Sequence, residues 1–320
     1  MMPQIFKIGT RGSKLALAQA DLVANAIKKE FPELQTEIKI IHTSGDKDRV
    51  RSLVSMSGSG VFVKELEESL LENAIDIAVH SLKDVPEQID SALLLAGFLK
   101  RENASDVLIS LGQSFKDLPC NSVIGTGSPR RILQLQEIRS DLKYKGIRGN
   151  LETRIAKVEN KELAGIILGA AGLNRLSLAK YITEEFQVEK LTPAIGQGII
   201  GIECKKERED VVEILKKITD GKTKKAAELE RAWMHFLGGG CKVPMAAYLK
   251  EKSSGYEFYA YLSNVESGRF IRKQISLNEN FSVETVLETF GKDFTEECKS
   301  KNIILPKDAN EHALLKYFGD

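Results

Sequence analysis

The chain has 320 residues, of which 42% are hydrophobic and 28% are charged, a balance typical of a globular protein and unlike that of a disordered one. Lys and Arg together number 46 and Asp and Glu 45, so the net charge of +1 argues against a general nucleic-acid coat or a polybasic membrane anchor. No apolar run approaches the ~18 residues of a membrane span, and the N-terminus has no secretory pattern. We therefore expect a cytoplasmic protein of about two or three domains.

The first part of the chain alternates between strand and helix patterns. Runs of apolar and β-branched residues predict the strands, and apolar residues spaced along one face predict the helices. The expected elements are strands over 5–9, 35–43 and 75–80 and helices over 13–30 and 61–72. This order is typical of a mostly parallel sheet covered by helices.

A second cycle of the same kind follows, and then the pattern changes. The second cycle has expected strands over 107–110, 123–126, 142–147 and 164–170 and helices over 129–139 and 151–160. After it come an expected strand over 199–203, helices over 207–217 and 223–237, an antiparallel meander over 243–250, 256–264 and 269–277, and a helix over 281–299. Gly238-Gly239-Gly240 is a strong stop for the second of these helices.

The fold class predicted from this order is α/β. Two α/β domains are expected, followed by a small α+β C-terminal domain in which helices accompany a three-stranded antiparallel sheet. The predicted boundaries are 1–99 with 198–217 for domain 1, 103–192 for domain 2 and 222–320 for domain 3.

Arginines recur where the expected strands end and the next helices begin. Ligands of parallel α/β sheets bind beyond the carboxyl ends of the strands, where backbone N–H groups and helix N-termini attract anions. Arginine adds a planar fork that fits a carboxylate or phosphate. Any single arginine is better explained as a solvated or ion-paired surface residue, but the recurrence predicts a polyanionic ligand. The residues concerned are Arg11, Arg130, Arg131, Arg148, Arg154 and Arg175.

Two further segments carry reactive side chains. Asp84 follows a buried strand, where it could bind a cationic or N–H-bearing substrate and transfer protons, or simply occupy a turn before Pro86. Cys241 follows three glycines and precedes Lys242, which suits a nucleophile or an attachment point, although free cysteine is more often a small buried apolar residue. The histidines and cysteines have no metal-ligand spacing, so no metal site is expected.

Several segments together make the chain resemble the porphobilinogen deaminase (hydroxymethylbilane synthase) family. They occur in the family's order between residues 9 and 244, and each is weak alone. The segments are Gly9–Ser13 with Leu15–Gln19, Thr43–Asp46, Gly60–Glu67, Asp76–Pro86, Gly125–Arg131, Arg148–Asn150, Pro193–Gly198 and Gly238–Pro244.

The resemblance implies a transferase of tetrapyrrole (heme) biosynthesis. It would polymerise four porphobilinogen molecules head to tail, with release of ammonia, into hydroxymethylbilane (preuroporphyrinogen). The reaction would be primed on a dipyrromethane cofactor bound through a thioether to Cys241. The family's two periplasmic-binding-protein-like domains surround a cleft, and we place the two chain crossings near 99–103 and 191–198. The resemblance also implies a monomer. Its small-molecule partner would be porphobilinogen, and it would have no nucleic-acid or membrane partner.

The resemblance also implies roles for individual residues. Asp84 matches the catalytic aspartate, and the six arginines above match those that bind the pyrrole carboxylates. The remaining cofactor- and substrate-binding positions are Ser13, Phe62, Ser81, Lys83, Thr126, Ser128, Gly149 and Gln197. Phe62 would stack over the site beside a mobile 44–60 loop, in which Ser59 stands where members often have lysine.

Two other functions are compatible with parts of the pattern. A two-domain anion-binding module or sensor explains the arginines but gives no role to Asp84 or Cys241. Nucleic-acid binding through Arg130 and Arg131 conflicts with the net charge of +1.

Overall fold

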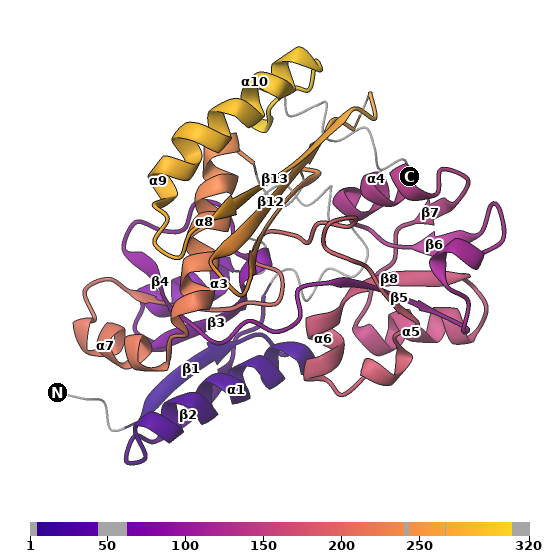
Figure 1. The fold of residues 1–320 in the computed structure, drawn as a ribbon. Helices are drawn as coiled ribbons and strands as arrows, with labels where there is room; N and C mark the ends of the chain where they lie inside the picture. The colour runs from indigo at the N-terminus through magenta and orange to yellow at the C-terminus, as the bar shows by residue number, and fades with distance from the viewer. Residues whose placement is uncertain (1–4, 44–62, 240–242, 266, 309–320) are drawn as a thin grey trace. The chain divides into compact units, whose positions relative to one another are not determined.

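The structure, a computed structural model, describes residues 5–43, 63–239, 243–265 and 267–308 (Figure 1). Phe62, Cys241 and the 44–60 loop therefore lie outside the described residues. The chain forms two compact units, Met1–Glu102 with Gly198–Ala227 and Asn103–Gln197 with Glu228–Asp320. It passes between them at 102–103 and at 197–198, within the two segments where crossings are predicted, and a third time at 227–228. The division of the second unit into residues 103–192 and 222–320 stays a prediction.

A five-stranded sheet with the order β2-β1-β3-β10-β4 forms the core of the first unit. β1, β2 and β3 are parallel, whereas β10 runs antiparallel to both of its neighbours. The elements are β1 (Phe6–Thr10), α1 (Lys14–Glu30), β2 (Thr36–Ile40), α3 (Lys64–Leu71), β3 (Ile77–Ser81), β4 (Leu93–Phe98), β10 (Ile200–Lys205) and α7 (Glu209–Ile218).

Alternate residues of β3 face opposite sides of this sheet, and helices cover both sides. Ile77 and Val79 share a core cluster with the buried face of α1 and with α7. Ala78 instead packs with Leu66 and Leu70 of α3. Helix α1 begins after Ser13 because the Ser13 hydroxyl accepts a hydrogen bond from the Ala16 N–H, at 3.2 Å.

The second unit contains a sheet of the same strand order, β7-β6-β8-β5-β9. β6, β7 and β8 are parallel, and β5 is antiparallel to β8. The elements are β5 (Asp106–Ser110), β6 (Val123–Gly125), α4 (Pro129–Ile138), β7 (Lys143–Lys145), α5 (Leu151–Glu159), β8 (Gly165–Gly169), α6 (Ala170–Arg175) and β9 (Glu184–Glu185).

The two sheets are equivalent in topology. In each sheet, the first of the three parallel strands lies between the second and the third. The fourth strand in the sheet lies beside the third and is antiparallel to it. This fourth strand follows a point where the chain passes from one unit to the other. For β5 this passage is at 102–103 and for β10 it is at 197–198. The prediction of two α/β domains is confirmed. Among the described residues, no helix combines the length and apolar character needed to cross a bilayer.

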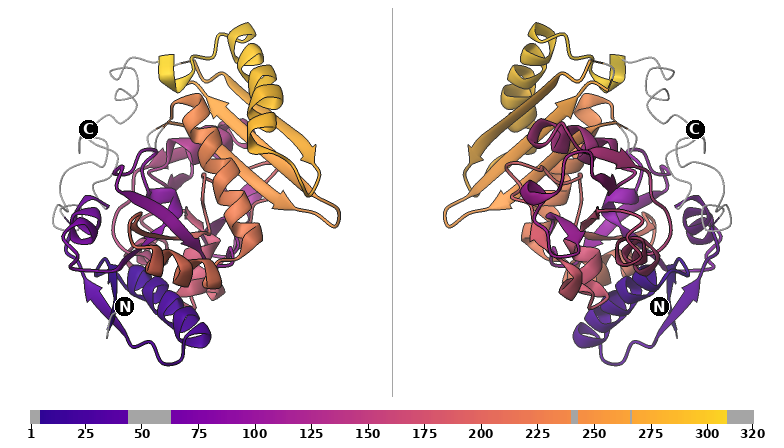
Figure 2. Two further views of the ribbon diagram at one scale, coloured as in Figure 1. Left: turned by 90° about the vertical axis from the view of Figure 1, so that its left-hand side faces the viewer. Right: turned by 90° about the vertical axis from the view of Figure 1, so that its right-hand side faces the viewer.

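The C-terminal part is a three-stranded antiparallel meander with helices on one face, as predicted (Figure 2). Its core centres on Trp233, whose ring contacts those of Phe258, Phe290 and Phe294. Gly238, with a φ of +69°, ends α8 and confirms the predicted glycine stop. The elements are α8 (Gly221–Leu237), β11 (Met245–Glu251), β12 (Tyr256–Ser263), β13 (Phe270–Leu277), α9 (Val283–Val286), a π-helical turn (Leu287–Gly291) and α10 (Lys292–Ser300).

Candidate active site

Four of the predicted site residues line one small cavity in the first unit, of about 80 Å³. β1 and β3 are adjacent and parallel, so their carboxyl ends lie at the same edge of the sheet. Arg11 follows β1, and Ser13 caps α1. Ser81 ends β3, and Asp84 closes the 3₁₀ turn Leu82–Asp84 that follows it. Residues about 70 positions apart in sequence thus meet at one cavity, with the Asp84 side chain exposed.

The cavity also has lining residues that the sequence analysis assigned no role. Gln19 is only 3% exposed, and its amide and the Ser81 hydroxyl are joined by contacts of 2.8 and 3.2 Å. A glutamine on the apolar face of α1, among Ala20, Val23 and Ile27, is the signal that could have revealed it. His80 lines the cavity too, whereas Lys83, although beside Asp84 in the turn, is not a lining residue.

The other predicted arginines lie at the matching edge of the second sheet. Because β6, β7 and β8 are parallel, the segments that follow them lie at one edge. Thr126, Ser128, Arg130 and Arg131 follow β6; Arg148, Gly149 and Arg154 follow β7; and Arg175 ends α6, directly after β8.

The turn after β7 depends on Gly149. Its φ of +103° is a conformation that favours glycine, and the next residue, Asn150, caps α5 through the Thr153 N–H at 2.8 Å. The Gly149 carbonyl accepts a hydrogen bond from Arg154 Nε, also at 2.8 Å. This contact holds Arg154 against the turn that carries Arg148.

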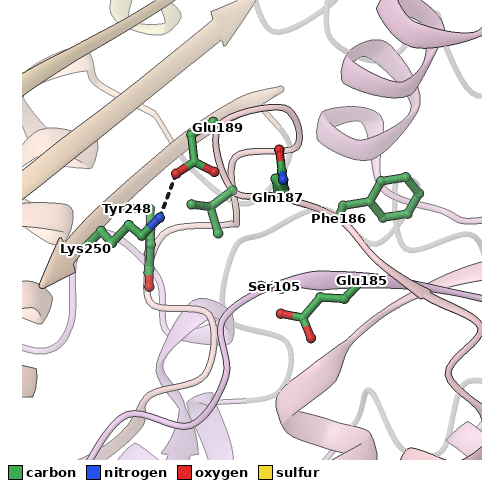
Figure 3. A pocket seen from close by; sticks show the side chains of 8 residues that line it. Ser105, Glu185, Phe186, Gln187, Glu189, Tyr248 and Lys250 are labelled. Atoms are coloured by element: carbon green, nitrogen blue, oxygen red, sulfur yellow. Dashed lines mark hydrogen bonds and ion pairs between the residues drawn. The ribbon is translucent and has the colours of Figure 1, made fainter. Parts of the chain in front are cut away.

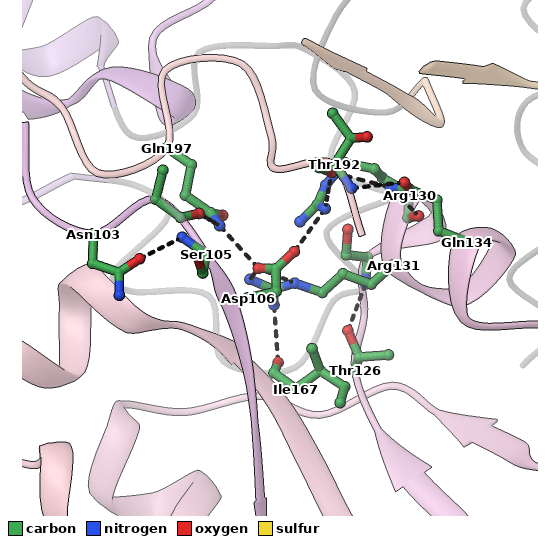
Figure 4. Close-up of polar contacts among 12 residues, drawn as sticks. Asn103, Ser105, Asp106, Thr126, Arg130, Arg131, Gln134, Ile167, Thr192 and Gln197 are labelled. Carbon is green, nitrogen blue, oxygen red and sulfur yellow. Dashed lines mark hydrogen bonds and ion pairs between the residues drawn. The ribbon is translucent and has the colours of Figure 1, made fainter. Parts of the chain in front are cut away.

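Arg130 and Arg131 are buried and are both bound by Asp106, the first residue of β5 (Figure 4). Arg131 contacts Asp106 Oδ1 through Nε and Nη2, at 3.0 and 2.7 Å, while Arg130 Nη1 lies 2.7 Å from Oδ2. Gln197 donates to Asp106 Oδ1 at 2.9 Å. Asp106 is not among the predicted site residues, and its only signal in the sequence is a charge at the start of an apolar strand.

This network carries a net charge of +1, because two guanidiniums face one carboxylate. Burial by itself would raise the pKa of Asp106, but Arg130 and Arg131 outweigh burial and hold that pKa well below its usual range. An excess of positive charge inside a protein is costly unless an anion approaches it. The arrangement therefore favours a carboxylate ligand at this sheet edge.

Replacement of Asp106 by Asn is expected to lower the free energy of unfolding by about 3–5 kcal/mol, because it leaves two buried guanidiniums without a counter-charge. Urea unfolding would measure this loss. The matched control is Asp141→Asn, which breaks the pair with Arg139 at the surface and should cost much less. Equal losses in the two variants would show that burial does not decide the strength of the Asp106 network.

A larger hollow of about 360 Å³ in the second unit contains none of the predicted site residues (Figure 3). Lys250 and Glu189 form an ion pair of 2.7 Å beside it, and Glu189 also accepts a hydrogen bond from Tyr259. A third charged lining residue, Glu185, accepts a hydrogen bond from Asn103 at 3.0 Å.

The family model and the curated relatives that match this chain point to one family. Residues 6–213 match the family described as "Porphobilinogen deaminase, dipyromethane cofactor binding domain". Porphobilinogen deaminase of Alkaliphilus metalliredigens is 38% identical over 307 residues, which cover 93% of this chain and 97% of that protein. Porphobilinogen deaminase of Syntrophus aciditrophicus is 40% identical over 270 residues, covering 84% and 88%. Among solved structures, substrate binding domain 2 of Lactococcus lactis GlnP aligns with a TM-score of 0.40 at 13% identity, covering 71% of this chain and 95% of that chain.

Proposed function

The chain belongs to the porphobilinogen deaminase family, and from this premise we propose how its residues divide the work. The protein is a transferase of tetrapyrrole biosynthesis that joins four porphobilinogen molecules head to tail into hydroxymethylbilane. It releases ammonia at each addition and uses a dipyrromethane cofactor as primer. The observation that carries the proposed division of roles is the cavity shared by Arg11, Ser13, Ser81 and Asp84.

Asp84 is proposed to stabilise the positive charge that develops on the pyrrole when ammonia leaves. A carboxylate near the pyrrole N–H accepts its hydrogen bond and opposes this charge, an effect that lowers a barrier by several kcal/mol (roughly 3) where the bound substrate excludes water from the carboxylate. Arg11 lines the same cavity and supplies a cation for a substrate carboxylate. In this proposal Asp84 interacts with the pyrrole ring of the substrate, and Arg11 binds a carboxylate side chain of the same ring.

The edge of the second sheet is proposed to bind the acetate and propionate groups of the cofactor and of the growing chain. The buried excess of one positive charge at Arg130 and Arg131 fits a dipyrromethane, which carries four carboxylates. Arg148, Arg154 and Arg175, at the same edge, extend the cationic surface. When bound, the cofactor supplies the pyrrole carbon on which the first substrate unit is added.

Cys241 is proposed as the attachment point of the cofactor. A thioether forms from a thiolate, and burial raises the pKa of Cys204 to about 12 and that of Cys298 to about 11. Both thiols are fully buried and poorly suited to this reaction. Cys120, which is exposed, and Cys241 are the remaining candidates, and the family resemblance of the segment 238–244 favours Cys241.

The proposal also covers the oligomeric state, the domains, the location and the partners of the protein. We infer a monomer of three domains, located in the cytoplasm, with no nucleic-acid partner. The near-neutral net charge supports the absence of a nucleic-acid partner, because wide polyanion binding needs a large positive excess.

An Arg148→Ala variant is expected to fold normally but to stall during elongation. The variant loses one charged hydrogen-bond partner of a substrate carboxylate, an interaction of about 1.5–3 kcal/mol. This loss corresponds to a turnover rate lower by about ten- to a hundredfold. Native mass spectrometry should show protein with one to three added substrate units accumulating. The matched control is Arg269→Ala, an exposed arginine of the C-terminal part that should leave turnover unchanged. An Arg148→Ala rate within twofold of wild type would remove Arg148 from the site.

A further inference from the structure

A buried pair of titratable side chains lies directly behind the cavity that contains Asp84. His80, on β3, is 5% exposed and Glu203, on β10, is 0% exposed. The imidazole Nε2 lies 3.1 Å from Glu203 Oε2. His80 also lines the cavity, so the pair connects the sheet interior with the candidate active site.

The sheet explains why these two side chains meet. Glu203 is paired with Ala78 across the antiparallel strands, and Ala78 and His80 are on the same face of β3, two residues apart. His80 and Glu203 are therefore diagonal neighbours on the face that α3 covers. Ser81, on the opposite face, bonds Gln19 of α1 instead.

Glu67, on α3, is a third member of this cluster. Burial, followed by the charge of Glu203, raises the pKa of Glu67 to about 7, while His80 opposes the shift and Asp90 adds to it. Oε1 of Glu67 and Oε1 of Glu203 are both buried without a hydrogen-bond partner in the described part of the chain. The buried imidazole thus contacts the carboxylate of Glu203 and lies within electrostatic range of that of Glu67.

The chemistry of the proposed function needs a proton acceptor at this place. In each condensation, a C–C bond forms between the α-carbon of the terminal pyrrole and the methylene carbon of the incoming unit, from which ammonia has left with the C–N electron pair. The C–H bond at the α-carbon then breaks, and its electron pair restores the aromatic ring. The released proton needs a base. If Asp84 took it, Asp84 would lose the negative charge with which it stabilises the ring.

We propose, on the basis of the function and the Asp84 role given above, that His80 is the proton acceptor of the condensation step and that Glu203 and Glu67 stabilise the imidazolium it becomes. Nε2–H donates to Glu203, and Nδ1 takes the α-proton, so that Asp84 stays ionised throughout. The proton then passes to water or to the released ammonia, which leaves as ammonium, and each cycle is balanced.

The test compares His80→Asn and Glu203→Gln with wild type, using porphobilinogen with hydrogen or deuterium at the α-carbon. In His80→Asn, kcat should fall about tenfold or more with little change in KM, because one proton acceptor is lost. The deuterium isotope effect on kcat should increase, since C–H cleavage becomes slower than the other steps. A purely structural role of His80 would lower kcat without changing the isotope effect, and that result would overturn the proposal.

The pH dependence of kcat provides the second measurement. His80 accepts a proton only in its uncharged form, so kcat of the wild type should fall when the pH is lowered. Glu203→Gln and Glu67→Gln each remove a carboxylate that favours the protonated imidazole, so in both variants kcat should begin to fall only at a lower pH than in the wild type. If kcat falls at the same pH in both variants as in the wild type, the proposed roles of the two carboxylates are contradicted.

Matched controls and the wild type separate the possible failures. Glu68→Gln, on the exposed side of α3, and Glu207→Gln, at an exposed position after β10, should keep the wild-type pH profile. If Glu203→Gln does not fold, Glu67→Gln still tests the pH dependence of kcat. A wild-type protein that makes no hydroxymethylbilane would refute the proposed function itself. An active wild type whose His80→Asn variant keeps the wild-type kcat would refute only this inference.

Discussion

The purified protein is expected to weigh more than its sequence by the mass of two pyrrole units, and Cys241→Ser is expected to lose both that mass and all production of hydroxymethylbilane. The serine hydroxyl has a far higher pKa than a thiol and is a poor nucleophile, so the thioether cannot form. Without the primer no chain begins, and the expected activity is at the detection limit. Intact-protein mass spectrometry and a stopped assay with porphobilinogen measure the two quantities.

Cys120→Ser is the matched control for this prediction. Cys120 is the exposed cysteine among the described residues, so it is the most accessible alternative thiol. This variant should keep both the additional mass and the activity. If the mass is lost in Cys120→Ser and kept in Cys241→Ser, the attachment point is Cys120.

Asp84→Asn is expected to keep the fold and the cofactor mass but to lower kcat by about a hundredfold or more. Asparagine has nearly the same shape, and a substitution at this exposed position is expected to change the free energy of unfolding by little. What disappears is the negative charge, and a loss of roughly 3 kcal/mol of charge stabilisation corresponds to about two orders of magnitude in rate. Single-turnover release of ammonia would measure the affected step.

Asp117→Asn is the matched control for Asp84→Asn. Asp117 is likewise exposed and likewise ends a three-residue 3₁₀ turn, Phe115–Asp117, but it is bonded to Ser114 and lies in the second unit. It should leave turnover unchanged. A near-normal rate in Asp84→Asn would exclude a charge-stabilising role for Asp84.

Local signals in the sequence predicted the elements and the chain segments of the site. Ser13 and Asn150 cap their helices, Gly238 ends α8, and apolar periodicity predicts which faces are buried. These effects act over a few residues, so a single sequence contains them. The positions of Arg11 and Asp84 directly after strands are predictable for the same reason. Their roles, and that of Cys241, remain to be tested by the variants above.

The partners of the reactive side chains were decided by tertiary structure alone. Asp106 binds Arg131 across 25 positions, and His80 meets Glu203 across 123 positions. Both acidic residues lie on the antiparallel strands that follow a passage between the units, and strand pairing sets which side chains face each other. Local propensity contains no information on such register. The sequence by itself therefore determined which residues stand at the strand ends, whereas only the folded sheets decided which buried charges surround them.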